Sequence, residues 1–302
     1  MTESAQTSGS GCFIKFWGVR GSIPTPGPGT VRYGGNTSCV ELRADGQIIV
    51  LDSGTGIRQL GLSLDAEFGD QPVSLTVLIT HTHWDHIQGF PFFLPAWKKQ
   101  NTIRVLGCEG AQSGLKQTLA GQMESPYFPV SLQGMPGNIQ IKDFSIPEFE
   151  IGPVRVSAFP VNHPGVAVGY RLRTKCGGDV VYMPDNEPTG LRCGNDDPCA
   201  ELPPDPKLVE YVRGADLLIA DAQYDDCEYP AHIGWGHGCI SDTVKLAAEA
   251  GVRKLFLFHH DPSHDDDKMD ALLAFTRRLA SEMGGGLEVF AAREGETVNL
   301  GS

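Results

Sequence analysis

The 302-residue sequence predicts an α/β (α+β) fold in which two mixed β-sheets pack together and helices cover their outer faces. Short strand-like runs dominate the first third of the chain. Helices are interspersed among the later strands, and the last section alternates helix, strand and helix. Functional residues of such layered folds lie on loops, so we expect active loops at one edge of the sheets.

The expected strands are short apolar runs bounded by Gly, Pro and Asn turns. They cover 13–17, 38–43, 47–51, 74–80, 103–107, 154–159, 167–173, 179–183, 215–220 and 254–258. Helices are expected from Ile57 onward, after residue 86, and over 206–212, 241–250 and 267–283. The segments 21–35 and 190–206 are rich in Gly or Pro and are predicted to be loops.

Composition limits the classes of protein that the chain can represent. We expect one domain over 12–302 after a disordered polar tail at 1–11, which lacks the pattern of a secretory signal. No apolar run is long enough to span a bilayer, so no membrane association is expected. The net charge of -13 disfavours long nucleic acid as a partner. Eight scattered cysteines indicate reduced thiols and a cytoplasmic protein. Cys193 and Cys199 lack the spacing of a structural zinc pair.

Four metal-capable side chains lie within six residues, directly after a predicted strand. The segment reads His-Thr-His-Trp-Asp-His from residue 81 to residue 86. His81 and His83 project from the same side of an extended backbone and can bind one ion, with bonds of about 2.0 Å. Asp85 and His86 follow as the chain curls, which aims them at a second ion. A lone histidine is usually a core residue, but this spacing predicts a paired-metal site.

Two ions need more ligands than this segment offers, and further candidates stand after later strands. They are His163 after 154–159, Asp185 after 179–183, and the neighbours His259 and His260 after 254–258. The carboxylate of Asp185 can bridge two ions about 3.5 to 4 Å apart.

Short motifs spread over most of the chain carry a resemblance to a known family. They are Tyr-Gly-Gly-Asn-Thr-Ser at 33–38, Leu-Asp-Ser-Gly-Thr-Gly at 51–56, the histidine motif at 81–86, His163-Pro164, Asp185, Gly-His-Gly at 236–238 and Leu-Phe-His-His-Asp-Pro at 257–262. From about Phe16 to Pro262 the chain resembles the metallo-β-lactamase superfamily. Within it, the chain looks like the phosphodiesterase branch that includes ribonuclease Z and the cyclic-phosphate and cyclic-nucleotide phosphodiesterases. The resemblance implies a four-layer αββα sandwich.

The resemblance also implies a complete set of metal ligands. One ion would bind His81, His83 and His163; the other would bind Asp85, His86 and the terminal histidine; Asp185 would bridge them. In the family the terminal histidine ligand stands directly after its strand, here 254–258, which favours His259 over His260. His260 then takes a supporting or loop role. Asp52 resembles the aspartate that orders the metal loop, with turn capping as the alternative. The ions implied are two divalent cations, zinc first, with manganese or iron as alternatives.

The implied chemistry is hydrolysis by a hydroxide held between the two ions, because coordination lowers the pKa of water from 15.7 toward about 7. His237 is the candidate general acid for the leaving group, and Asp221 is the residue that would hold its ring. Asp85 is counted with them as catalytic as well as metal-binding. A turn role is the alternative for His237.

The expected substrate is a small or cyclic phosphodiester, with cyclic nucleotides as the leading example. Only 21 residues lie between His163 and Asp185, where ribonuclease Z itself carries a tRNA-gripping arm, so a tRNA endonuclease is not expected. A thioester or lactam hydrolase of the same superfamily is one alternative. A non-catalytic metal-dependent binding or sensor protein is another. A homodimer is expected by analogy with the branch.

No residue is firmly predicted to bind substrate. Arg171, Arg173 and Lys175 alternate along one strand and share a face, which suggests phosphate contact, but a solvated sheet face is the commoner cause. Arg20 is a further candidate with no spacing argument behind it.

Overall fold

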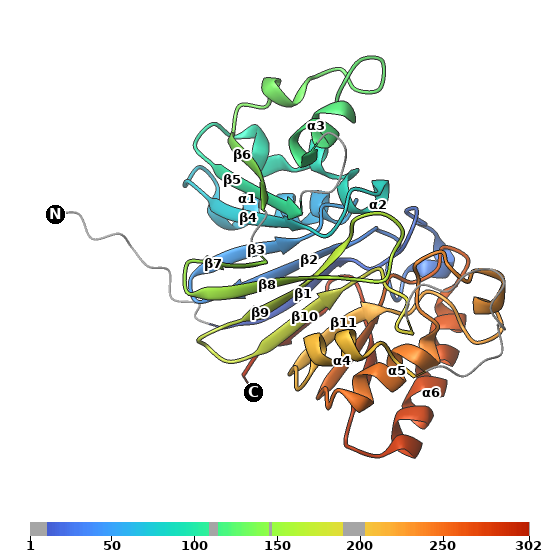
Figure 1. The fold of residues 1–302 in the computed structure, drawn as a ribbon. Helices are drawn as coiled ribbons and strands as arrows, with labels where there is room; N and C mark the ends of the chain where they lie inside the picture. The colour runs from blue at the N-terminus through green and yellow to red at the C-terminus, as the bar shows by residue number, and fades with distance from the viewer. Residues whose placement is uncertain (1–10, 109–113, 145–146, 190–202, 302) are drawn as a thin grey trace.

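A computed structural model describes residues 11–108, 114–144, 147–189 and 203–301 (Figure 1). The predicted tail, apart from its last residue, lies outside the described residues. So does most of the loop predicted at 190–206, including Cys193 and Cys199.

The described strands form two seven-stranded sheets. The first has the order β14-β1-β2-β3-β4-β5-β6, with β1 at Phe13–Gly18, β2 at Cys39–Ala44, β3 at Gln47–Leu51, β4 at Ser74–Ile79, β5 at Thr102–Cys108, β6 at Asn138–Phe144 and β14 at Thr297–Asn299. The second has the order β13-β12-β11-β10-β9-β8-β7, with β7 at Glu148–Ile151, β8 at Val154–Pro160, β9 at Val168–Arg173, β10 at Asp179–Met183, β11 at Leu217–Asp221, β12 at Lys254–Phe258 and β13 at Glu288–Ala291.

Both sheets are mixed. The run from β3 to β6 is parallel, whereas β14, β1, β2 and β3 pair antiparallel. In the second sheet β10 to β13 are parallel, and β7 to β10 alternate in direction. Because β8 and β10 both run against β9, they point the same way as β11 and β12. The carboxyl ends of these four strands therefore meet at one edge of the second sheet.

Helices cover the outer faces of the two sheets (Figure 1). Helices α1 (Ile57–Phe68) and α3 (Gly114–Gly121) contact elements of the first sheet, while α5 (Ile240–Glu249) and α6 (Asp266–Met283) contact the second and α4 (Pro206–Val212) packs on α5. One apolar cluster fills the space between the sheets. A second lies between the first sheet and its helices, and a third lies between the second sheet and its helices. The predicted class, two mixed sheets flanked by helices, is confirmed.

The helix expected after the histidine motif is reduced to a single turn within it. Helix α2 spans Trp84–Ile87, and two 3₁₀ turns follow at Phe90–Phe92 and Leu94–Trp97. A proline in each of these turns prevents a continuous helix, since it lacks an N–H donor.

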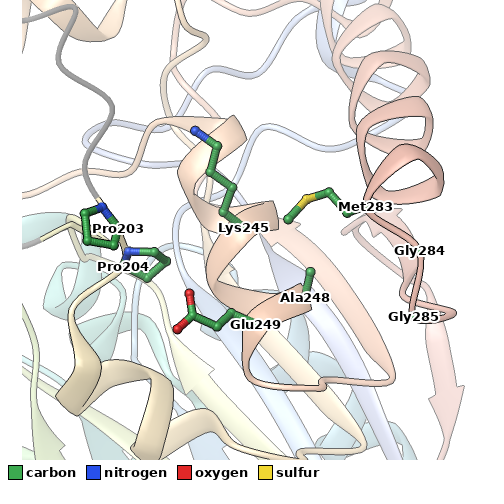
Figure 2. Close-up of a pocket in the computed structure, with 8 residues that line it drawn as sticks. All are labelled: Pro203, Pro204, Lys245, Ala248, Glu249, Met283, Gly284 and Gly285. Carbon is green, nitrogen blue, oxygen red and sulfur yellow. The ribbon is translucent and has the colours of Figure 1, made fainter.

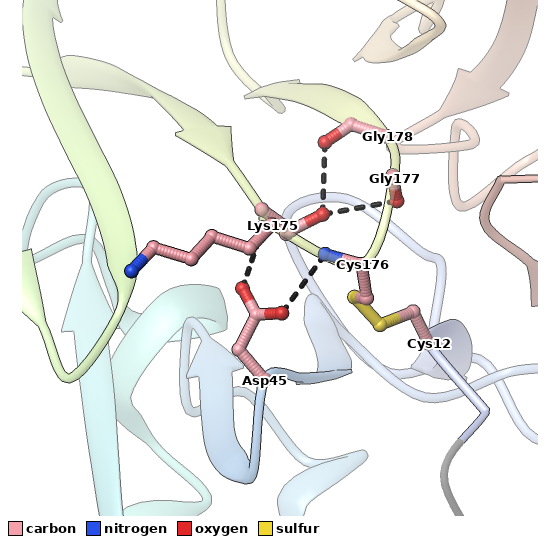
Figure 3. The surroundings of a disulfide bond; sticks show 7 residues. Cys12, Asp45, Lys175, Cys176, Gly177 and Gly178 are labelled. Carbon is pink, nitrogen blue, oxygen red and sulfur yellow. Dashed lines mark hydrogen bonds between the residues drawn. A yellow bond between two sulfur atoms is a disulfide. The ribbon is translucent and has the colours of Figure 1, made fainter.

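The expectation of reduced thiols is wrong for one pair, because Cys12 and Cys176 form a disulfide (Figure 3). Cys12 precedes β1, and Cys176 lies in the turn between β9 and β10. The Asp45 carboxylate accepts hydrogen bonds from the backbone N–H of Lys175 and of Cys176 and so fixes that turn. A separation of 164 residues in sequence hides this neighbourhood from sequence analysis.

A cavity of about 520 Å³ lies between the later part of α5 and the end of α6 (Figure 2). Its lining includes Lys245, Glu249 and Met283. The candidate acid His237 stands before the opposite, amino end of α5, so this cavity is separate from the predicted metal site. Among the described residues, no helix has the length and apolar character needed to cross a membrane.

Candidate metal centre

The predicted ligands all stand just beyond the carboxyl ends of strands. The histidine motif follows β4 of the first sheet, while His163, Asp185 and His259 follow β8, β10 and β12 of the second. The edges of the two sheets meet here, so residues more than 170 positions apart come into contact: His259 Nε2 lies 3.0 Å from Asp85 Oδ2.

One group of candidate ligands consists of His81, His83, His163 and Asp185, whose potential ligand atoms lie within 4.8 Å of one another. Nε2 of His163 is 3.1 Å from Nδ1 of His83. Oδ2 of Asp185 faces this group, 3.6 Å from His81 Nε2 and 3.9 Å from His163 Nε2.

A second group consists of Asp85, His86 and His259. Nε2 of His86 is 3.1 Å from Asp85 Oδ2. Oδ1 of Asp185 faces this group, 3.1 Å from His86 Nε2 and 3.4 Å from His259 Nε2. The two oxygens of Asp185 thus face different groups, as a bridging carboxylate requires.

The residues fit a pair of divalent cations. Nε2 of His81, Nε2 of His86 and Oδ1 of Asp185 are buried and make no well-aligned hydrogen bond, although the last two atoms lie 3.1 Å apart. Buried polar atoms are normally paired, and imidazole nitrogen with carboxylate oxygen is a donor set for zinc and similar ions. Burial alone would raise the pKa of Asp185, but the nearby His259, His86 and His81 outweigh it and hold that pKa well below its usual range. The carboxylate is therefore ionised and ready to bind a cation.

Four of the imidazoles are held through Nδ1 by an acceptor, which leaves Nε2 for the ligand position. The pairs are His81 with Thr80 Oγ1 at 3.1 Å, His86 with Asp52 Oδ2 at 2.8 Å, His163 with the Gly236 carbonyl at 2.9 Å and His259 with Gln223 Oε1 at 3.0 Å. Thr80, Gly236 and Gln223 were not predicted from the sequence. Gln223 follows Asp221 by two residues on the same strand end, which is the one signal that could have indicated it.

Asp52 is fully buried and connects three parts of the fold. Its Oδ1 accepts from the backbone N–H of Thr80 at 2.8 Å, and its Oδ2 accepts from Nδ1 of His86 and from the Tyr182 hydroxyl, at 2.8 and 2.9 Å. Tyr182 belongs to β10 of the other sheet. These bonds link the histidine motif to the second sheet, and the role of Asp52 in ordering the metal loop stays a prediction.

His237 and Asp221 form a pair beside Asp185. Nδ1 of His237 is 2.8 Å from Asp221 Oδ2 and 3.9 Å from Asp185 Oδ2. Burial alone would lower the pKa of His237, but the carboxylates of Asp221 and Asp185 outweigh it and raise that pKa to about 9. Asp221 is itself fixed by the backbone N–H groups of Gln223 and Gly238, both at 3.0 Å from its Oδ1.

His260 lies outside both groups, with Nε2 donating to the Ala292 carbonyl at 2.9 Å. Burial is the main cause that lowers its pKa to about 3, so it is a neutral, structural residue.

His259 has a left-handed backbone with φ of 58°, and a Cβ on Gly21 would lie 2.4 Å from its Nδ1. The glycine at 21 is therefore needed for close approach to this imidazole.

The arginines considered as phosphate contacts are used elsewhere. Arg20 is fully buried and donates to the carbonyls of Gly34, Asp261 and His264, so the suggestion of substrate contact is wrong. Arg171 forms an ion pair with Asp179 at the start of β10, which is the end of that strand away from Asp185.

A cluster of histidines and aspartates at the joined edges of two mixed sheets defines a metal-dependent hydrolase. The chain belongs to the beta-lactamase superfamily, because the beta-lactamase superfamily domain matches residues 47–260.

The chain is also similar to proteins named ribonuclease Z over most of its length. Ribonuclease Z of Natronomonas pharaonis is 26% identical over 319 residues, covering 95% of this chain and 97% of the relative. The metallo-beta-lactamase fold protein YhfI from Bacillus subtilis superposes with a TM-score of 0.67 at 18% identity, covering 96% of this chain and all of that one. Zn(2+)-bound PqqB from Methylobacterium extorquens superposes with a TM-score of 0.65 at 15% identity, covering 95% and 100%. These structural likenesses concern the fold.

Proposed function

We propose that this chain hydrolyses small phosphodiesters, with cyclic nucleotides as the leading example, using two divalent cations. The observation that carries the proposal is the position of Asp185, whose two oxygens face two separate groups of histidines and aspartate. In this proposal His81, His83 and His163 bind one ion, and Asp85, His86 and His259 bind the other. Zinc is the proposed metal, supported by the donor set and by the zinc-bound relative in fold.

Two bound cations would neutralise phosphate oxygens and make a coordinated water acidic enough to ionise near neutral pH. The protein's own residues act on the leaving group. His237 is held at Nδ1 by Asp221, so its Nε2 is the atom that donates a proton to the departing oxygen. Without bound metal the neighbouring carboxylates raise the pKa of this imidazole to about 9, which favours the protonated form that a general acid needs.

A small substrate is favoured over a long RNA by the short connection and the charge. Between His163 and Asp185 the chain contains only strands β9 and β10 with their turns, and the net charge is -13. The relatives named ribonuclease Z make an RNA the second candidate.

Residues 12–302 are proposed to form one domain that pairs as a homodimer. A cytoplasmic location is also proposed, although the Cys12–Cys176 disulfide, a bond more typical of oxidising compartments, is an observation against it.

The test is metal analysis followed by rates on a panel of substrates. We expect two metal ions per chain and hydrolysis of bis-p-nitrophenyl phosphate and a cyclic nucleotide, lost on chelation and restored by zinc. Asp185→Asn should lose both metal and activity, while Asp70→Asn, an exposed carboxylate outside the centre, should lose neither. Faster turnover of a thioester or a lactam would favour the alternative hydrolase. Bound metal with no turnover of any compound would favour a binding or sensor protein.

A further inference from the structure

Two tryptophans remain exposed beside the metal centre, Trp84 by 78% and Trp235 by 59%. Tryptophan side chains are usually mostly buried. Trp84 lies in sequence between the candidate ligands His83 and Asp85, and Trp235 lies two residues before His237. Each indole is therefore an exposed apolar surface on a segment that carries candidate site residues.

The backbone that carries Trp84 is fixed. Trp84 begins helix α2, whose turn is closed by His86 N–H donating to the His83 carbonyl at 3.0 Å and by Gln88 N–H donating to the Trp84 carbonyl at 2.7 Å. Asp85 in the same turn accepts from the backbone N–H of Ser22 at 2.8 Å. The indole projects from a rigid element rather than from a loose loop.

Trp235 is positioned by a column of aromatic rings that leads out from the site. The Tyr224 ring contacts the His237 ring edge-on, with centroids 6.1 Å apart, and stacks on the His232 ring at 4.1 Å with an interplanar angle of 12°. Trp235 contacts His232 edge-on at 4.8 Å. This column holds the second indole in place without covering it.

Sequence neighbours of both tryptophans contact His163. Nε2 of this imidazole lies 3.1 Å from His83, the residue before Trp84, and its Nδ1 lies 2.9 Å from the carbonyl of Gly236, the residue after Trp235. His83 is itself exposed, whereas most of the other candidate ligands are buried. Solvent therefore reaches the centre at His83, the residue directly before Trp84.

We propose that Trp84 and Trp235 form a stacking site for the planar base of a nucleoside whose phosphodiester lies at the metal centre. The proposal rests on the phosphodiesterase function proposed above and names its substrate class, nucleoside phosphodiesters rather than alkyl or sugar phosphodiesters. An indole face stacks on any purine or pyrimidine, because every base offers a π-face. Preference among bases is therefore expected to be weak.

The test compares two esters with the same leaving group, thymidine 5′-(p-nitrophenyl) phosphate and methyl p-nitrophenyl phosphate. Trp84→Ala and Trp235→Ala should each lower kcat/KM on the thymidine ester more than on the methyl ester, by about 5- to 150-fold, the range that one stacked base contributes. The loss should fall mainly on KM, and the Phe variants should retain most of the preference. Tyr127→Ala, which removes an 81% exposed aromatic ring from a segment that carries no candidate ligand, is the matched control.

A second readout does not depend on turnover. Adenosine 5′-monophosphate should quench the tryptophan fluorescence of the metal-loaded protein, and the double alanine variant should lose this quenching although Trp17 and Trp97 remain. Equal losses on both esters, or quenching that survives in the double variant, would overturn the stacking site. So would an alanine variant that turns a dimer into a monomer while KM stays the same, since the indoles would then belong to a subunit interface. If wild-type protein binds metal but cleaves neither ester, the phosphodiesterase proposal fails, and the quenching experiment still decides on the indoles.

Discussion

Replacing Asp52 by Asn tests the residue that joins the two sheets behind the metal centre. Asparagine has the same shape and tolerates the left-handed backbone found here, with φ of 60°, so the change removes one acceptor without adding backbone strain. If the amide keeps its oxygen toward Thr80, the Thr80 hydroxyl can still donate to that oxygen, while the NH₂ group faces two donors that lose their acceptor, His86 Nδ1–H and the Tyr182 hydroxyl. A buried donor left without an acceptor costs about 1 to 3 kcal/mol, so two donors give a loss of about 2 to 6 kcal/mol.

The assay is urea unfolding of the metal-free protein, combined with metal affinity measured by competition with a chelator. We expect Asp52→Asn to lower the free energy of unfolding by that amount and to weaken metal binding about 10- to 100-fold, because His86 loses the partner that orients it. Tyr182→Phe removes the hydroxyl itself, so no buried donor is left without an acceptor. This variant should lower the free energy of unfolding by only about 0.5 to 1.5 kcal/mol. A loss below about 1 kcal/mol for Asp52→Asn, with unchanged metal affinity, would refute this reasoning and leave Asp52 as a turn residue.

Three further predictions concern the acid, the metals and the disulfide. His237→Gln should lower kcat/KM by about 10²- to 10⁴-fold for diesters with alkoxide leaving groups and far less for bis-p-nitrophenyl phosphate, whose leaving group needs no proton. Similar losses on both substrates would show that His237 does not act as the acid. Removal of metal by a chelator should lower Tm, because a metal at 100 times its Kd stabilises the folded state by about 2.7 kcal/mol. A Tm that does not change when chelator is added would argue against bound ions. Cys12→Ser should lower the urea midpoint, because the closed loop is long and its loss should reduce the free energy of unfolding by at most about 5 kcal/mol. The variant should keep its kcat/KM, because Cys176 lies in the turn before β10, away from Asp185. An unchanged midpoint would contradict that account.

The parts of the fold that the sequence predicts are those with a strong local pattern. Buried strands such as β4, β10 and β12 consist of apolar runs bounded by turn residues, and their bounds agree closely with the expected ranges. The strands that were missed are weakly patterned. Strand β6 alternates exposed and half-buried positions at a sheet edge, and β14 has only three residues. Their pairing is determined by neighbours distant in sequence, which a local pattern does not contain.

The candidate ligands were predictable because metal-binding residue types are distinctive and each stands at a strand end. The residues that orient them were not, since a glutamine such as Gln223 or a threonine such as Thr80 is common at any turn. Arg20 shows the opposite error: a cation near a Gly-rich loop suggested substrate contact, yet it is buried among backbone carbonyls. Only three-dimensional packing distinguishes these cases.

The arrangement of ligands at strand ends has a consequence for how this scaffold can diversify. Each candidate ligand stands in a loop segment that begins where a strand ends at this rim. Lengthening or shortening such a segment changes the walls around the entrance while the positions of the strand termini stay fixed. New specificities can therefore arise by remodelling of the rim alone, with no change to the candidate metal ligands.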